Sequence, residues 1–129
     1  METIQKIEEA SFVVGERNGF DGFIITTDRQ QIKIGISDYS RCCESWGHFA
    51  SLDNFDDFIG ADLYGIKLVD SVLNVSKMEE YKFYEACFMF VNLETSKGTL
   101  QFTAYNDHNG YYSHEAVVIS EQLDHSEYL

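Results

Sequence analysis

Residues 84–119, YEACFMFVNLETSKGTLQFTAYNDHNGYYSHEAVVI, decide the fold. They contain three runs rich in β-branched and aromatic residues, at 84–95, 99–106 and 111–119. The breaks between the runs, Thr-Ser-Lys-Gly and Asp-His-Asn-Gly, each end in a Gly, which supplies the positive φ of a tight turn. In the middle run apolar residues alternate with Thr, Gln and Tyr, the period of a half-buried strand. The stretch predicts three consecutive strands joined by two tight turns.

The rest of the chain predicts more strands than helices. Strands are expected at 3–14, 23–27, 31–37 and 61–75, with an Asn18-Gly19 turn after the first. A short helix is expected at 54–59, with Asp53 or Asn54 as its N-cap, and 76–82 is a polar connection with room for one helical turn. Residues 38–53 are expected to form an irregular loop. The predicted class is α+β, mainly antiparallel β: a curved sheet or small barrel-like sandwich of about seven strands with one or two short helices.

Length and composition indicate a single domain. The chain has 129 residues, of which 44% are hydrophobic, enough to build one core. We expect one domain over residues 1–120 and a flexible acidic tail at 121–129. No apolar run approaches the ~20 residues of a membrane-spanning helix, and the start METIQKIEEA is too polar for a signal or transit peptide. The expected location is the cytoplasm, with the three Cys reduced.

Net charge is the most unusual bulk property. There are 22 acidic and 9 basic residues, a net charge of -13, and no Lys or Arg follows Lys97. Such a surface repels nucleic acid and anionic lipid and attracts basic protein surfaces. We therefore expect neither direct nucleic-acid binding nor membrane binding. The alternative is that the acidity serves solubility alone.

An acidic cluster marks the start of the expected helix. Asp53, Asp56 and Asp57 lie in or just before its first turn, where the helix dipole favours carboxylates by ~0.3–1 kcal/mol each. This structural role is sufficient to explain the cluster without a ligand.

The three cysteines suggest a site for metal or thiol chemistry. Cys42 and Cys43 are adjacent, which does not reproduce the Cys-x₂-Cys spacing of structural zinc sites. A site built from Cys42 or Cys43 with His48 and Cys87 is conceivable. The alternative is that the thiols are buried and pack as small hydrophobic groups.

The segment DHNGYYSH at 107–114 gathers residue types that can perform acid/base chemistry. A hairpin turn also prefers Asx-Gly, and strands prefer Tyr, so the turn explains most of the pattern. Tyr111 and Tyr112 point to opposite faces of a strand, so one of them can join a binding surface. The sequence contains no phosphate-binding loop, metalloprotease motif or nucleophile elbow, so we expect no enzyme activity, no cofactor and no metal.

The chain resembles a family of small proteins from phages and Gram-positive bacteria that is known only as a domain of unknown function. The resemblance covers residues 20–119. It rests on the Cys42-Cys43-Glu44 loop, on Phe58-Ile59-Gly60, and on Lys97-Gly98 followed by Asn109-Gly110-Tyr111-Tyr112-Ser113.

The resemblance implies a phage setting, in which small acidic proteins are often inhibitors of host defence, including anti-CRISPR proteins and DNA mimics. Their carboxylates occupy a basic channel that otherwise holds nucleic acid. The leading hypothesis is therefore a non-enzymatic inhibitor that blocks the basic surface of a host protein, with a Cas nuclease as the most specific candidate. The expected partner-binding residues are Asp53, Asp56, Asp57, Asp62, Glu79, Glu80, and Tyr111 or Tyr112. The alternatives are the metal or thiol protein described above and a structural or regulatory module.

Overall fold

A computed structural model describes residues 2–16, 19–39, 45–107 and 112–129. In these residues nine antiparallel strands form one open sheet, accompanied by one 3-10 helix and one short α-helix. The elements in chain order are β1 (Glu2–Val13), β2 (Gly19–Thr27), β3 (Gln31–Ser37), β4 (Ser45–Ala50), η1 (Asp56–Phe58), β5 (Asp62–Val69), α1 (Val75–Glu80), β6 (Ala86–Thr95), β7 (Gly98–Asp107), β8 (Glu115–Ile119) and β9 (Asp124–Tyr128).

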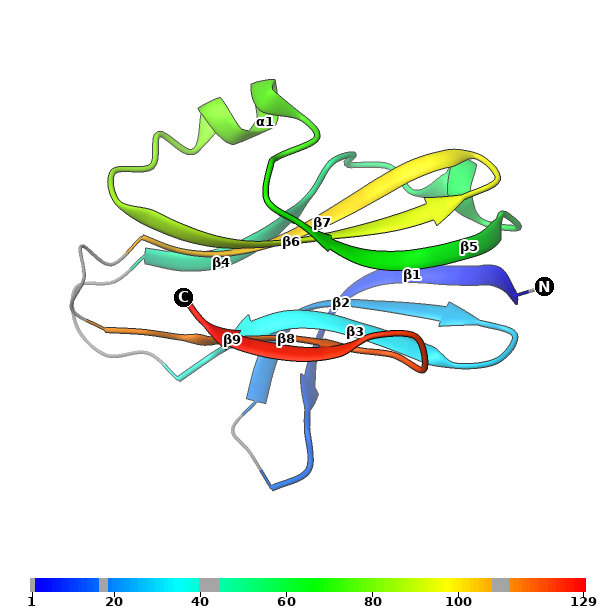
Figure 1. Ribbon diagram of the computed structural model, residues 1–129, viewed down its shortest axis with the longest axis horizontal. Helices are drawn as coiled ribbons and strands as arrows, with labels where there is room; N and C mark the ends of the chain where they lie inside the picture. Colours follow the sequence, from blue (N-terminus) through cyan, green and yellow to red (C-terminus); the bar gives the residue numbers. More distant parts are fainter. Residues whose placement is uncertain (1, 17–18, 40–44, 108–111) are drawn as a thin grey trace.

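The sheet is folded over so that its two halves face each other. The strand order is β4-β7-β6-β5-β1-β2-β3-β8-β9. Figure 1 shows β4, β7, β6 and β5 in the upper layer and the other five strands in the lower layer. The layers are joined where β1 pairs with β5, through the Glu2–Leu63 and Thr3–Asp62 pairs. We call this short pairing the seam.

The main hydrophobic core lies between the two layers. The expected alternation of β3 is confirmed at Ile32, Ile34 and Ile36, which are at most 1% exposed and belong to this core. The rings of Phe23 on β2 and Phe102 on β7 lie 4.7 Å apart and connect the lower layer to the upper one. Burying such side chains contributes roughly 1.5–3 kcal/mol each, so the layers are held together mainly by packing.

Mainly antiparallel β structure is confirmed, whereas the expected strand count and barrel-like shape fit only loosely. The described residues form nine strands rather than about seven, in one open sheet that folds over on itself. One additional strand is β4, which lies in the segment expected to be a loop and pairs with β7. Its sequence SWGHFA has no period of two, because Phe49 and Ala50 are adjacent and both buried.

The second additional strand is β9, which takes the place of the flexible tail expected at 121–129. It pairs with β8 from Glu115–Tyr128 to Ile119–Asp124. Leu129 is only 5% exposed, and its backbone N–H and C=O both bond to the backbone of His114. Buried backbone groups of this kind need partners, and the pairing with β8 and His114 supplies them.

The stretch at residues 84–119, expected to form three consecutive strands, is only partly a meander. The β6–β7 hairpin is confirmed, with Gly98 at φ +114° in the turn. The expected second hairpin is wrong, because β8 pairs with β3 and β9 instead of β7 and lies in the other layer. Residues 108–111 of that turn lie outside the described residues.

Both expected helical segments are helical, with different bounds. The helix expected at 54–59 is the single turn η1. The expected N-cap at Asp53 or Asn54 is wrong, because Phe55 holds that position and no side chain caps the turn. Asn54 Oδ1 instead accepts a hydrogen bond from the Asp56 N–H at 2.9 Å. The second segment is α1, whose N-cap is Asn74. The strand expected at 61–75 ends at Val69. Neither helix in the described ranges is long and apolar enough to span a membrane.

Candidate functional site

The acidic residues predicted to bind a partner fall into two groups. Asp56 and Asp57 lie on η1 and are exposed. This turn is held beside the seam, because the Gly60 N–H donates to the Ile4 carbonyl at 2.7 Å. Glu79 and Glu80 are exposed on α1, which Figure 1 shows above β6 and away from η1.

Asp53 connects these two groups. Its carboxylate pairs with the ammonium of Lys77 on α1 at 2.5 Å. The Lys77 side chain is only 16% exposed, whereas that of Asp53 is 94% exposed. The amide of Asn74 also donates to the carbonyl of Ser51, so the segment after β4 is tied to the start of α1. Asp53 therefore has a structural partner, and its charge is compensated locally.

Asp62 and Tyr112 are placed less favourably for binding a partner. Asp62 is half-buried at the start of β5, where its backbone N–H donates to Ser96 Oγ and its C=O accepts from the Ser96 N–H. Tyr112 is half-buried, and its carbonyl accepts a hydrogen bond from the Asn106 amide at 2.8 Å. Tyr111 lies outside the described residues.

The structure tests part of the proposed metal or thiol site. Cys42 and Cys43 lie outside the described residues. Cys87 is exposed, so the expectation of a buried thiol is wrong for this residue, which lies near the start of β6. Within the described ranges no three His, Cys, Asp or Glu side chains are grouped so that they could hold a metal ion.

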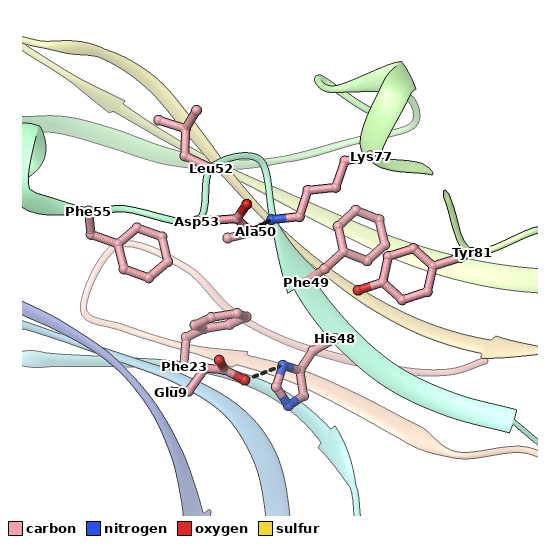
Figure 2. Close-up of a pocket in the computed structure, with 10 residues that line it drawn as sticks. All are labelled: Glu9, Phe23, His48, Phe49, Ala50, Leu52, Asp53, Phe55, Lys77 and Tyr81. Carbon is pink, nitrogen blue, oxygen red and sulfur yellow. Dashed lines mark hydrogen bonds and ion pairs between the residues drawn. The ribbon is translucent and has the colours of Figure 1, made fainter. Parts of the chain in front are cut away.

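A cavity that no sequence pattern predicted is lined by residues of β1, β2, β4 and α1. Its volume is about 190 Å³. Figure 2 shows the side chains around it, contributed by both layers of the sheet, by the segment after β4, and by α1 and the residue that follows it. Its apolar lining is formed by Phe23, Phe49, Ala50, Leu52 and Phe55. We call it the His48 cavity.

The polar side chains of the His48 cavity come from distant parts of the chain. His48 Nδ1 lies 3.6 Å from Oε2 of Glu9, too far for a hydrogen bond. This nitrogen is buried and has no hydrogen-bond partner among the described residues. Burial lowers the pKa of His48 below 6.5, although the charges of Glu9 and Asp21 oppose this shift, so the imidazole is neutral at pH 7.

Tyr81 forms another wall of the cavity. Its ring stacks on that of Phe49 at 4.9 Å. Burial raises the pKa of Tyr81, and the negative charges of Glu80, Asp53 and Glu9 raise it further. The phenol therefore stays protonated at pH 7, and Tyr81 is not activated as a nucleophile or base. The cavity thus combines aromatic rings with hydrogen-bonding groups and suits binding better than catalysis.

One comparison with known proteins identifies a family. The sequence model of a family described as a domain of unknown function (DUF7448) matches residues 2–118. Neither the curated proteins nor the solved structures contain a significant match to the chain. The match agrees with the resemblance to a family of unknown function and extends it toward the start of the chain.

Proposed function

The chain belongs to the DUF7448 family of domains of unknown function, and we propose that it is a non-enzymatic acidic protein that binds a basic protein partner. The observation that carries this proposal is a set of exposed, uncompensated carboxylates. Asp56, Asp57, Glu79 and Glu80 are all exposed. Within the described residues none of their side chains forms an ion pair or hydrogen bond.

Uncompensated surface carboxylates have a physical consequence for association. Together with a net charge of -13, they produce a negative potential that speeds encounters with basic surfaces and repels nucleic acid. A nucleic-acid-binding groove without its ligand is such a basic surface. In its most specific form the proposal is a phage-encoded inhibitor that occupies the groove of a host nuclease of the Cas type, in the cytoplasm of the host.

Affinity capture from host lysate at low and high salt tests the proposal. The immobilised chain should retain a basic nucleic-acid-processing protein at low salt and release it at high salt, because salt screens exposed charges. The double variant D56K/D57K should bind this protein about tenfold more weakly or worse, since two attractions become repulsions.

The matched control is E121K/D124K, which changes the net charge equally at two exposed residues of the β8–β9 region. It should retain the partner more strongly than D56K/D57K. Binding that is insensitive to salt, or equally weakened by both pairs, would contradict recognition through η1.

The metal or thiol protein remains the alternative from a different class. Its test is elemental analysis of the full chain purified without chelator. A stoichiometric metal that is lost in a Cys42→Ser/Cys43→Ser variant would favour this alternative over the acidic binding protein. A structural or regulatory module, the third possibility, predicts that no salt-sensitive partner is captured.

A further inference from the structure

The His48 cavity contains one carboxylate that no cation compensates. Of the two carboxylates at the cavity, Asp53 is paired with Lys77. Among the described residues the ionic contact of Glu9 is with His48, whose imidazole is neutral at pH 7. The cavity therefore carries a net charge of about -1 within a strongly acidic protein, which favours a cationic ligand over an anionic one.

The size of the cavity limits what can enter. Pockets for drug-sized ligands measure roughly 300–1,000 Å³, whereas this cavity measures about 190 Å³. A whole cofactor is therefore too large for it, but the end of one long side chain is not. Interface hot spots are commonly of this kind, with an anchor side chain from one protein in a pocket of the other.

The lining selects a planar cation with several donors. Among the aromatic rings that line the cavity, Phe23 and Phe49 are buried, whereas Phe55 is half-buried and Tyr81 is exposed. A cation within about 6 Å of an aromatic face is attracted to it. The carboxylate of Glu9 accepts hydrogen bonds, and His48 Nδ1 lacks a partner among the described residues. A guanidinium group has five donors and no acceptor, stacks on rings, and is more weakly hydrated than an ammonium group.

We propose that the His48 cavity is an anchor site for an arginine side chain of the basic partner protein. The guanidinium group donates to Glu9 at the mouth of the cavity and stacks against its aromatic lining. The origin of the arginine in a partner protein rests on the proposed function, whereas the binding of a guanidinium group can be measured without the partner.

An NMR titration with N-acetyl-arginine amide tests the site directly. Saturable shift changes are expected for the side chains of His48, Phe23 and Tyr81, and the neutral isostere N-acetyl-citrulline amide should not produce them. Nα-acetyl-lysine amide, whose side-chain ammonium is free, should bind more weakly than the arginine compound, because an ammonium group lacks the planar, fork-shaped set of donors of a guanidinium group. The absence of saturable shifts, or equal binding of the citrulline compound, would overturn the assignment.

Glu9→Gln and Glu8→Gln form a matched pair of variants. Glu9 is 70% exposed, so its loss should weaken arginine amide binding by about two- to fivefold, the scale of an exposed ion pair. Glu8 precedes Glu9 on β1 and pairs with Lys6 at 2.9 Å. Its replacement should leave the dissociation constant of arginine amide unchanged. Equal effects of the two variants would contradict the role of Glu9.

The outcomes also separate this proposal from the proposed function. Arginine amide binding without capture of any basic protein would support the cavity assignment and refute the proposed function. Capture of a basic protein that depends on Asp56 and Asp57, in a chain that does not bind arginine amide, would support the proposed function and refute the cavity assignment.

Discussion

Replacing Glu2 with glutamine should destabilise the protein strongly at neutral pH. Glu2 is only 5% exposed, and its carboxylate accepts hydrogen bonds from Thr27 Oγ1 at 2.5 Å and from the amides of Gln30 and Gln122, each at 2.7 Å. The carboxylate therefore links the start of β1 to the β2–β3 turn and to the segment between β8 and β9.

The size of the effect follows from these contacts. All three partners donate to the carboxylate of Glu2, whereas the glutamine side chain has only one acceptor oxygen and an NH₂ group that itself donates. This NH₂ group would therefore lie against at least one of the three donors, and that contact would have no acceptor. A hydrogen bond to a charged group contributes about 1.5–3 kcal/mol and a neutral one about 0.5–1.5 kcal/mol, while a buried donor without a partner costs about 1–3 kcal/mol. We expect the free energy of unfolding to fall by about 2–4 kcal/mol at pH 7. The control Glu8→Gln should change it by less than about 0.5 kcal/mol, because the Lys6 pair is exposed.

The effect should depend on pH in a defined direction. Burial raises the pKa of Glu2, but the three hydrogen bonds and the charge of Arg29 together lower it by more, so the pKa lies below 4.5. A depressed carboxyl pKa stabilises the fold above pH 4.5, and this contribution is lost as the pH falls through the folded-state pKa. The difference between wild type and Glu2→Gln should therefore shrink as the pH falls below 4.5.

Urea unfolding, followed by the fluorescence of Trp46, measures the free energy of unfolding at pH 7 and its change with pH. Two results would refute the reasoning: equal stability of the variant and the wild type at pH 7, or a difference that stays constant down to about pH 3. The first would mean that the three hydrogen bonds contribute nothing net. The second would mean that the effect of the substitution does not come from the charge.

Two further predictions concern the His48 cavity and the β2–β3 pair. Burial lowers the pKa of His48 below 6.5, so the unfolded chain binds the proton more readily than the folded one, and stability should fall as the pH drops below 6.5. His48→Gln should make the melting temperature depend less on pH between pH 7 and about pH 5. Gly22→Ala should cost at least about 1–3 kcal/mol in thermal unfolding, because its Cβ would lie 2.0 Å from the Ile34 carbonyl oxygen, whereas in Gly65→Ala the Cβ meets no atom within 4 Å and stability should be unchanged or higher. Equal melting temperatures for the two glycine variants would contradict the close approach of β2 and β3.

Local sequence signals predicted the strands that have one buried face. The Ile32, Ile34 and Ile36 alternation identified β3, and the turn at Gly98 identified the β6–β7 hairpin, because both depend on residues near in sequence. The partner of β8 depends on distant residues. Ala116 and Val118 face the main core, while Val117 packs with Phe12 and Phe20 on the opposite face, so both faces of β8 are covered. Its hydrogen-bonding partners are β3 and β9, which lie far from the turn in sequence or follow β8 in the chain. The Asn-Gly signal before β8 carries no information about this requirement.

Only the part of the candidate site that consists of exposed charged side chains was predictable from the sequence. The carboxylates of Asp56, Asp57, Glu79 and Glu80 were expected on the surface because charged side chains are rarely buried without a partner. The His48 cavity was not predictable, because Glu9 lies on β1 and His48 on β4, in opposite layers of the folded sheet. The pairing of Asp53 with Lys77 likewise depends on where α1 lies relative to the end of β4.

Strand β9 explains a further use of the acidic composition. It is the last strand in the sheet order, and an edge strand presents backbone groups that can pair with another molecule. Asp124 and Glu127 lie on this strand, so two such edges meeting side by side would bring carboxylates together. The acidic composition therefore has a further consequence at this edge of the sheet, where it disfavours pairing between copies of the chain.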